Sequence, residues 1–292
     1  MPRPLALLLA PACLLLTLPL AAETSVWKVT KGDHSLYLGG TCHVLRTTDF
    51  PLPPEFDAAY AAASSVHFET DIARAQSPEM QQIVTQQGMF TDGMTLEKAV
   101  GPAAWKAVLA HCERLGIPPA NFATMKPWLF TVVITVIEMQ KLQLTLEGVD
   151  MHYFKKAKAD KKPTGELETF ENHVKFITTL GAGHESEMVA NSIEEIAEMP
   201  KMLNELLAAW KAGDVAKLDE TMLKDMRTKY PAIFQSLLVD RNNAWLPKLE
   251  AMLKTPETEL VLVGAGHMAG PEGLLAQLKA RGCTIEQIKA KN

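Results

Sequence analysis

Gly40-Thr41-Cys42-His43 and Gly264-Ala265-Gly266-His267 are two short motifs near opposite ends of this 292-residue chain. Each follows an apolar run typical of a β-strand, first at residues 36–38 and then at residues 260–263. In an open α/β sheet, ligands bind at the carboxyl ends of the strands. Two such strands lying side by side would bring His43 and His267 together across most of the chain. The motifs therefore predict a metal site or a two-histidine acid–base site at one edge of a sheet.

Glu69 is the third candidate for this site, because it ends the next predicted strand, residues 66–69. A carboxylate beside two imidazoles can complete a His/His/Glu metal set, or act as general base on a metal-bound water. The alternative is an ordinary surface glutamate at a strand end. His67 shares a face with Glu69 and is expected to be a packed or supporting group rather than a ligand. Asp71 lies just beyond and could orient a ligand.

Arg241-Asn242 follows an apolar run and is expected at a helix start, where an Arg and an amide can bind a carboxylate or polarise a carbonyl. The alternative is a helix cap with a salt bridge to a neighbouring acidic residue. The stretch Glu166-Leu167-Glu168-Thr169 could place one carboxylate in a cleft, but a solvated helix start explains it equally well. Five other histidines have no supporting pattern, namely His34, His111, His152, His173 and His184.

The order of the predicted elements indicates an α/β fold with a mixed central sheet. Residues 26–39 predict a β-hairpin, and a helix over 55–63 with a strand over 65–69 completes a βαβ-like unit. Residues from about 77 to 245 are mostly helical in pattern, and another strand and helix follow them. We therefore expect one domain, residues 23–292, in which both ends of the chain build the sheet around a large helical insertion.

The first 22 residues have the pattern of a cleavable secretory signal peptide, with a basic residue, an apolar run and small residues before Glu23. We therefore expect a secreted or periplasmic protein with no transmembrane span after cleavage; an uncleaved anchor is the alternative. The net charge of −5 makes nucleic acid an unlikely partner. Three cysteines remain after cleavage, and a Cys112–Cys283 disulfide is our guess among pairings that the sequence leaves open.

These motifs resemble the TraB/GumN family, which also includes the Tiki proteins. The match runs in order along the mature chain and comprises the hairpin ending in His43, the strand ending in Glu69, Lys126-Pro127-Trp128, Gly148-Val149-Asp150, Leu167-Glu168-Thr169, Arg241-Asn242 and the motif ending in His267. The resemblance implies a metal centre of His43, Glu69 and His267. It also implies manganese or cobalt as the ion, with zinc or iron as alternatives. Cys42 departs from the apolar residue usual in the first motif, which leaves the identity of the metal open.

The sequence and the resemblance together lead us to expect a metal-dependent hydrolase, specifically a peptidase, acting on a peptide or small molecule. His43, Glu69 and His267 would hold the metal, with Glu69 as ligand or general base. Arg241 would stabilise an oxyanion or anchor a substrate carboxylate. Two other classes remain open. One is a non-catalytic metal- or haem-binding protein of the cell envelope, and the other is an interaction protein that keeps the histidines only for folding.

Overall fold

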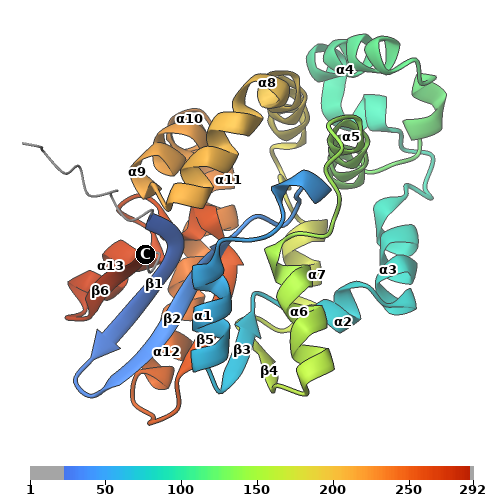
Figure 1. Cartoon of the computed structure of the whole chain (residues 1–292). Coiled ribbons are helices and arrows are strands. Elements are labelled where there is room, and N and C mark those ends of the chain that lie inside the picture. Colours follow the sequence, from blue (N-terminus) through green and yellow to red (C-terminus); the bar gives the residue numbers. More distant parts are fainter. Residues whose placement is uncertain (1–22, 290–292) are drawn as a thin grey trace, which may run out of the picture.

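A computed structural model describes residues 23–289 of the chain (Figure 1). The predicted signal peptide, residues 1–22, lies outside the described residues. Six strands form one sheet in the order β4-β3-β5-β2-β1-β6. Their bounds are β1 (Glu23–Lys31), β2 (His34–Thr41), β3 (Ser65–Phe68), β4 (Thr164–Glu166), β5 (Glu259–Gly264) and β6 (Thr284–Lys289).

The sheet is mixed, and strands from both ends of the chain build it, as the sequence predicts. Strand β1 runs antiparallel to both β2 and β6, while β2, β5, β3 and β4 are parallel neighbours. In the parallel ladder between β2 and β5, Gly40 pairs with Val263 and Thr41 with Gly264. Both histidine motifs therefore leave the sheet at the same level of adjacent strands.

Strand β4 lies within the insertion, which the sequence predicts to be mostly helical. Its three residues pair in parallel with Val66–Phe68 of β3 and extend the sheet at its edge. Gly165 lies against the ring of His67, where a Cβ atom would come within 2.5 Å of the imidazole. A strand of three residues that contains a glycine is too short to show alternation, so periodicity could not reveal it.

Helices cover both faces of the sheet and form the insertion. The α-helices are α1 (Pro54–Ala62), α2 (Ile72–Ala75), α3 (Pro78–Gly88), α4 (Leu96–Leu115), α5 (Pro127–Lys141), α6 (Val149–Asp160), α7 (Phe170–Thr178), α8 (Glu185–Ala212), α9 (Val215–Leu218), α10 (Lys224–Lys229), α11 (Pro231–Phe234), α12 (Asp240–Met252) and α13 (Leu274–Ala280). Short 3₁₀ turns are η1 (Thr47–Asp49), η2 (Pro119–Phe122) and η5 (Ala265–Met268), and two π-helical turns are η3 (Asp219–Leu223) and η4 (Gln235–Val239).

Alternate residues of the central strands point to opposite faces, so each face of the sheet has its own apolar core. On one face Leu260 and Leu262 pack with α1, α6 and the end of α8, whose Trp210 is fully buried. On the other face Val261 and Val263 pack with α12 and α13. Because helices pack against both faces of the sheet, β5 is fixed in the middle of the domain.

The insertion has an apolar core of its own, made mainly by α4, α5 and the first part of α8, at the upper right of Figure 1. Pro127 begins α5 and Trp128 is buried, as the sequence predicts. Within residues 23–289, no helix combines the length and apolar character needed to span a bilayer. The guessed Cys112–Cys283 disulfide is wrong, because both thiols are free and lie in separate cores, one in the insertion and one beside the sheet.

Candidate active site

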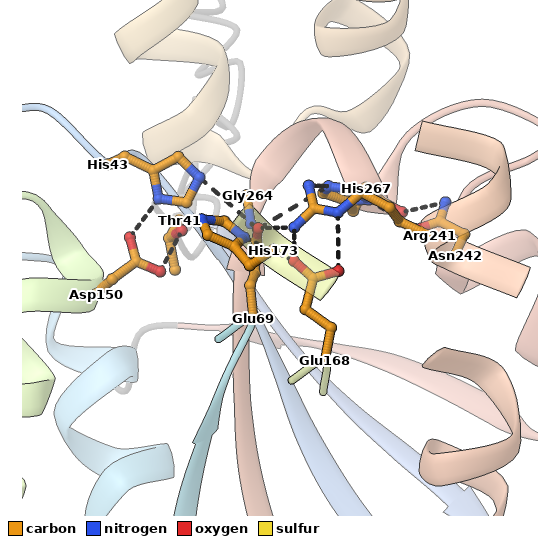
Figure 2. Close-up of polar contacts among 10 residues, drawn as sticks. All are labelled: Thr41, His43, Glu69, Asp150, Glu168, His173, Arg241, Asn242, Gly264 and His267. Carbon is orange, nitrogen blue, oxygen red and sulfur yellow. Dashed lines mark hydrogen bonds and ion pairs between the residues drawn. The ribbon is translucent and has the colours of Figure 1, made fainter. Parts of the chain in front are cut away.

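Four parallel strands deliver polar side chains to one edge of the sheet. His43 follows β2, His267 follows β5 within η5, Glu69 follows β3 and Glu168 follows β4. Backbone hydrogen bonds from Leu167 and Glu168 to the carbonyls of Phe68 and Glu69 extend the ladder beyond β4. The carboxyl ends of parallel strands meet at one edge, so residues distant in sequence gather there (Figure 2).

Asp150 at the start of α6 fixes the orientation of the His43 ring. One of its carboxylate oxygens lies 2.8 Å from His43 Nδ1, and the other accepts a hydrogen bond from Thr41 at 3.0 Å. Asp150 also raises the pKa of His43 to about 9, and burial opposes this shift. The ring remains 58 % exposed, so solvent screens part of this attraction. Its Nε2 atom faces Glu69 Oε1 at 3.7 Å, too long for a hydrogen bond.

Asn242 fixes the ring of His267 in the same way. Its side-chain amide donates to the carbonyl oxygen of Glu272 at 2.9 Å, which leaves Oδ1 to accept from His267 Nδ1 at 2.7 Å. His267 Nε2 therefore keeps its lone pair, and it lies 3.9 Å from Glu69 Oε1. Burial lowers the pKa of His267 to about 4, so this imidazole is neutral at pH 7.

Glu69 is the common neighbour of both histidines. Its Oε1 accepts a hydrogen bond from the backbone of Gly264 at 2.7 Å, and its Oε2 lies 2.5 Å from Arg241 Nη2. Burial alone would raise the pKa of this carboxyl, but the positive charges of Arg241 and His43 and the hydrogen bond from Gly264 hold it far below its usual range. Glu69 is therefore ionised and is a weak base.

Arg241 lies at the first turn of α12 and uses nearly all of its donors within the site. It forms a two-pronged pair with Glu168, at 3.3 Å from Nε and 2.8 Å from Nη2, and its Nη1 donates to His267 Nε2 at 3.3 Å. The guanidinium lies between the rings of Phe176 and Trp245. One Nη1 hydrogen has no partner among the described residues, so a single donor remains for a molecule bound at the site.

Two cavities open beside this network. One of about 210 Å³ is bordered by His43, Glu69, Asp150 and His173, together with Phe68, Thr70 and Ile72. A second of about 550 Å³ lies along α7 and α12, where Arg241 and Phe176 form part of its wall. A small molecule could therefore reach the site from solvent through the first cavity, and the second cavity could hold the part of that molecule that extends past Arg241.

The residue types at the site, two imidazoles and a carboxylate, are those expected for a His/His/Glu metal centre. Both Nε2 atoms face one carboxylate oxygen, and both Nδ1 atoms are held by a second polar group, which is how protein metal ligands are commonly oriented. Within residues 23–289, however, no group of three His, Cys, Asp or Glu side chains is close enough to hold an ion as it stands. Arg241 also occupies the lone pair of His267 Nε2. The residue types suit a metal ion, but the side chains would have to move closer together to bind one.

The structure brings together all four site residues predicted from the sequence, His43, Glu69, His267 and Arg241. Two weaker candidates lie outside the cluster. His67 contacts Ser65 at 3.2 Å, and Asp71 caps α2 by accepting from the backbone of Arg74.

The sequence predicted no role for Asp150 or His173, and Glu168 was only one of two carboxylates that could have faced a cleft. The contact between Glu168 and His173 could have been predicted from the sequence. Thr169 is the N-cap of α7, and the residue before an N-cap commonly meets the fourth residue of the helix, which here is His173. Their side chains are 2.7 Å apart.

Gly148 sets the distance between α6 and the loop that carries His43. A Cβ atom there would lie 2.3 Å from the backbone of Cys42 and His43, although the backbone angles of Gly148 suit any residue. We expect Gly148→Ala to lower the free energy of unfolding by about 1–3 kcal/mol by overpacking this contact. Urea denaturation measures the loss. Gly266→Ala is the control, because its Cβ would have ordinary contacts at 3.7 Å or more; equal stability of the two variants would contradict the prediction.

Comparison with known proteins agrees with the resemblance seen in the sequence. The uncharacterised protein YbaP of Escherichia coli (strain K12) is 25% identical over 248 residues, which cover 85% of this chain and 88% of that protein. YbaP of Shigella flexneri matches to the same extent. No solved structure gives a significant match. The model of the TraB/PrgY/gumN family matches residues 25–287, and the chain therefore belongs to this family.

Proposed function

We propose that this protein is a metal-dependent hydrolase, specifically a peptidase, with His43, His267 and Glu69 as metal ligands. The observation that carries the proposal is the convergence of two oriented imidazole Nε2 atoms on one ionised carboxylate oxygen. Imidazole with carboxylate suits several divalent transition metals, and the family resemblance favours manganese or cobalt over zinc or iron. A bound ion would polarise a substrate carbonyl and lower the pKa of a water molecule.

The protein groups around the ligands have separate tasks in this proposal. Asp150 and Asn242 hold the Nδ1 atoms of the histidines, so that each Nε2 faces Glu69. The low pKa of Glu69 suits a ligand better than a general base, because a weak base removes protons inefficiently. Arg241 neutralises the buried carboxylates and keeps one N–H for an oxyanion that develops on the substrate. For His267 to bind the metal, its Nε2 atom would have to lose the hydrogen bond from Arg241.

We also propose that the protein acts outside the cytoplasm, because the pattern of residues 1–22 is that of a signal peptide. A non-catalytic metal protein would share the same three ligands, so binding and hydrolysis must be measured separately.

The proposal predicts one metal ion per chain, lost in His43→Ala/His267→Ala. Mass spectrometry of protein purified without chelator, and after loading with Mn, Co, Zn or Fe, measures the content. The matched control is His67→Ala/His184→Ala, which removes two histidines outside the site and should keep the metal. Wild type should also cleave members of an unbiased peptide library only when loaded. Absence of metal from wild type under every loading condition would sink the proposal, and metal without cleavage would favour the binding protein.

A further inference from the structure

His173 is a third histidine at the proposed metal centre. It borders the 210 Å³ cavity together with His43 and Glu69, although it comes from α7 in the helical insertion. Its side chain is 19 % exposed, so a molecule in the cavity can reach it. In Figure 2 it lies in the same cluster as the residues of the two histidine motifs.

The contact with Glu168 determines which nitrogen of His173 faces a substrate. His173 Nδ1 lies 2.7 Å from Glu168 Oε1, and an ionised carboxylate only accepts hydrogen bonds. Burial alone would raise the pKa of Glu168, but His173 and Arg241 lower it, so this carboxylate is ionised. Nδ1 therefore carries the hydrogen. Nε2 has no hydrogen-bond partner among the described residues, and it is the nitrogen left for the cavity.

Glu168 is itself held in place, which makes the His173 ring a fixed group rather than a mobile one. Arg241 binds both oxygens of Glu168, and Thr169 begins α7 by accepting from the backbone of Asn172 at 3.2 Å. A carboxylate that orients an imidazole through Nδ1 also stabilises the imidazolium formed when Nε2 takes up a proton. His43 has the same kind of partner in Asp150, but the Nε2 atoms of His43 and His267 both face Glu69, and that of His173 has no such pairing among the described residues.

We infer that His173 is the proton-transfer group of the site and that its substrates are amides; the inference rests on the proposed hydrolase function. His173 Nε2 accepts a proton from the attacking water as the oxygen forms its bond to the carbonyl carbon. The C–N bond then breaks as Nε2 delivers that proton to the departing nitrogen. Amide and water become acid and amine, and His173 returns to its neutral form. An amine leaves poorly without a proton, so a fixed shuttle matters most for this class of substrate.

The test compares two substrates that share one acyl segment: the library peptide that wild type cleaves fastest, and the p-nitrophenyl ester of its acyl part. In His173→Ala, peptide cleavage should fall by roughly 10²–10⁴-fold, whereas ester cleavage should fall less, because nitrophenolate leaves unprotonated and only the activation of water is lost. Metal content should stay at the wild-type level. Added imidazole should restore part of the peptide cleavage by entering the space that the ring vacates.

His184→Ala is the matched control, because His184 also pairs through Nδ1 with a glutamate, Glu187, and does not border the cavity; its activity should equal wild type. An active wild type with unchanged peptide cleavage in His173→Ala would overturn the inference and leave the hydrolase proposal intact. Equal loss on both substrates, loss of metal, or absence of imidazole rescue would each overturn it in favour of a structural or ligand role. A wild type that cleaves no member of the peptide library under any metal loading would overturn both proposals.

Discussion

Arg241→Met is expected to lower the free energy of unfolding by about 3–5 kcal/mol, because it leaves two buried carboxylates without their counter-ion. The side chains of Arg241 and Glu69 are each 10 % exposed, and Glu168 is equally buried. Methionine keeps much of the packing between Phe176 and Trp245, so the loss reports mainly on charge. Urea denaturation followed by circular dichroism measures the change.

Arg74 provides the matched control for this prediction. It also bridges two glutamates, Glu79 and Glu171, but its side chain is 39 % exposed. Exposed pairs contribute roughly 0–1 kcal/mol, so Arg74→Met should have a small effect. Similar losses in the two variants would show that the buried network at the site has no special importance for stability.

Glu69→Gln is expected to weaken metal binding by at least about 100-fold, because loss of a supporting residue alone costs roughly 10–100-fold and Glu69 is a proposed ligand. The amide keeps the size of the side chain and an oxygen for the Gly264 N–H, so the fold should persist. Titration against a metal-chelating dye measures the affinity, and cleavage of the library peptide should fall in parallel.

Glu259→Gln is the control for this substitution. Glu259 is another buried glutamate, but it begins β5 at the end of the strand opposite the site. Its substitution should leave metal affinity unchanged. If Glu69→Gln bound metal as tightly as wild type, Glu69 would not be a ligand, and the proposed centre would reduce to the two histidines.

Strand periodicity and the repeated motif were sufficient to predict the centre of this fold. The apolar runs before His43 and His267 are short and each ends at a glycine, which is consistent with buried parallel strands. Their adjacency could not follow from periodicity, since any two parallel strands have the same pattern. It was inferred from the matching turns, and the ladder between β2 and β5 confirms it.

The positions of Arg241 and His173 could not be derived in the same way. A π-helical turn, η4, precedes α12 and shifts the rotation of the helix relative to a regular 3.6-residue period, so the side on which Arg241 emerges was not predictable. His173 lies in the amphipathic helix α7, where a single polar residue gives no indication of function. Its significance depends on the position of α7 beside the sheet, and this follows from packing over the whole domain.

The pairing of β2 with β5 also determines when during synthesis the site can form. A growing chain that has reached residue 258 already contains His43, Glu69, His173 and Arg241, but it lacks the strand that joins β2 to β3. Contacts between segments so distant in sequence form late, because the long intervening chain must first be ordered. An unfinished or C-terminally truncated chain would therefore have no assembled centre. The residues after 258 therefore determine whether the two histidine motifs can meet at all.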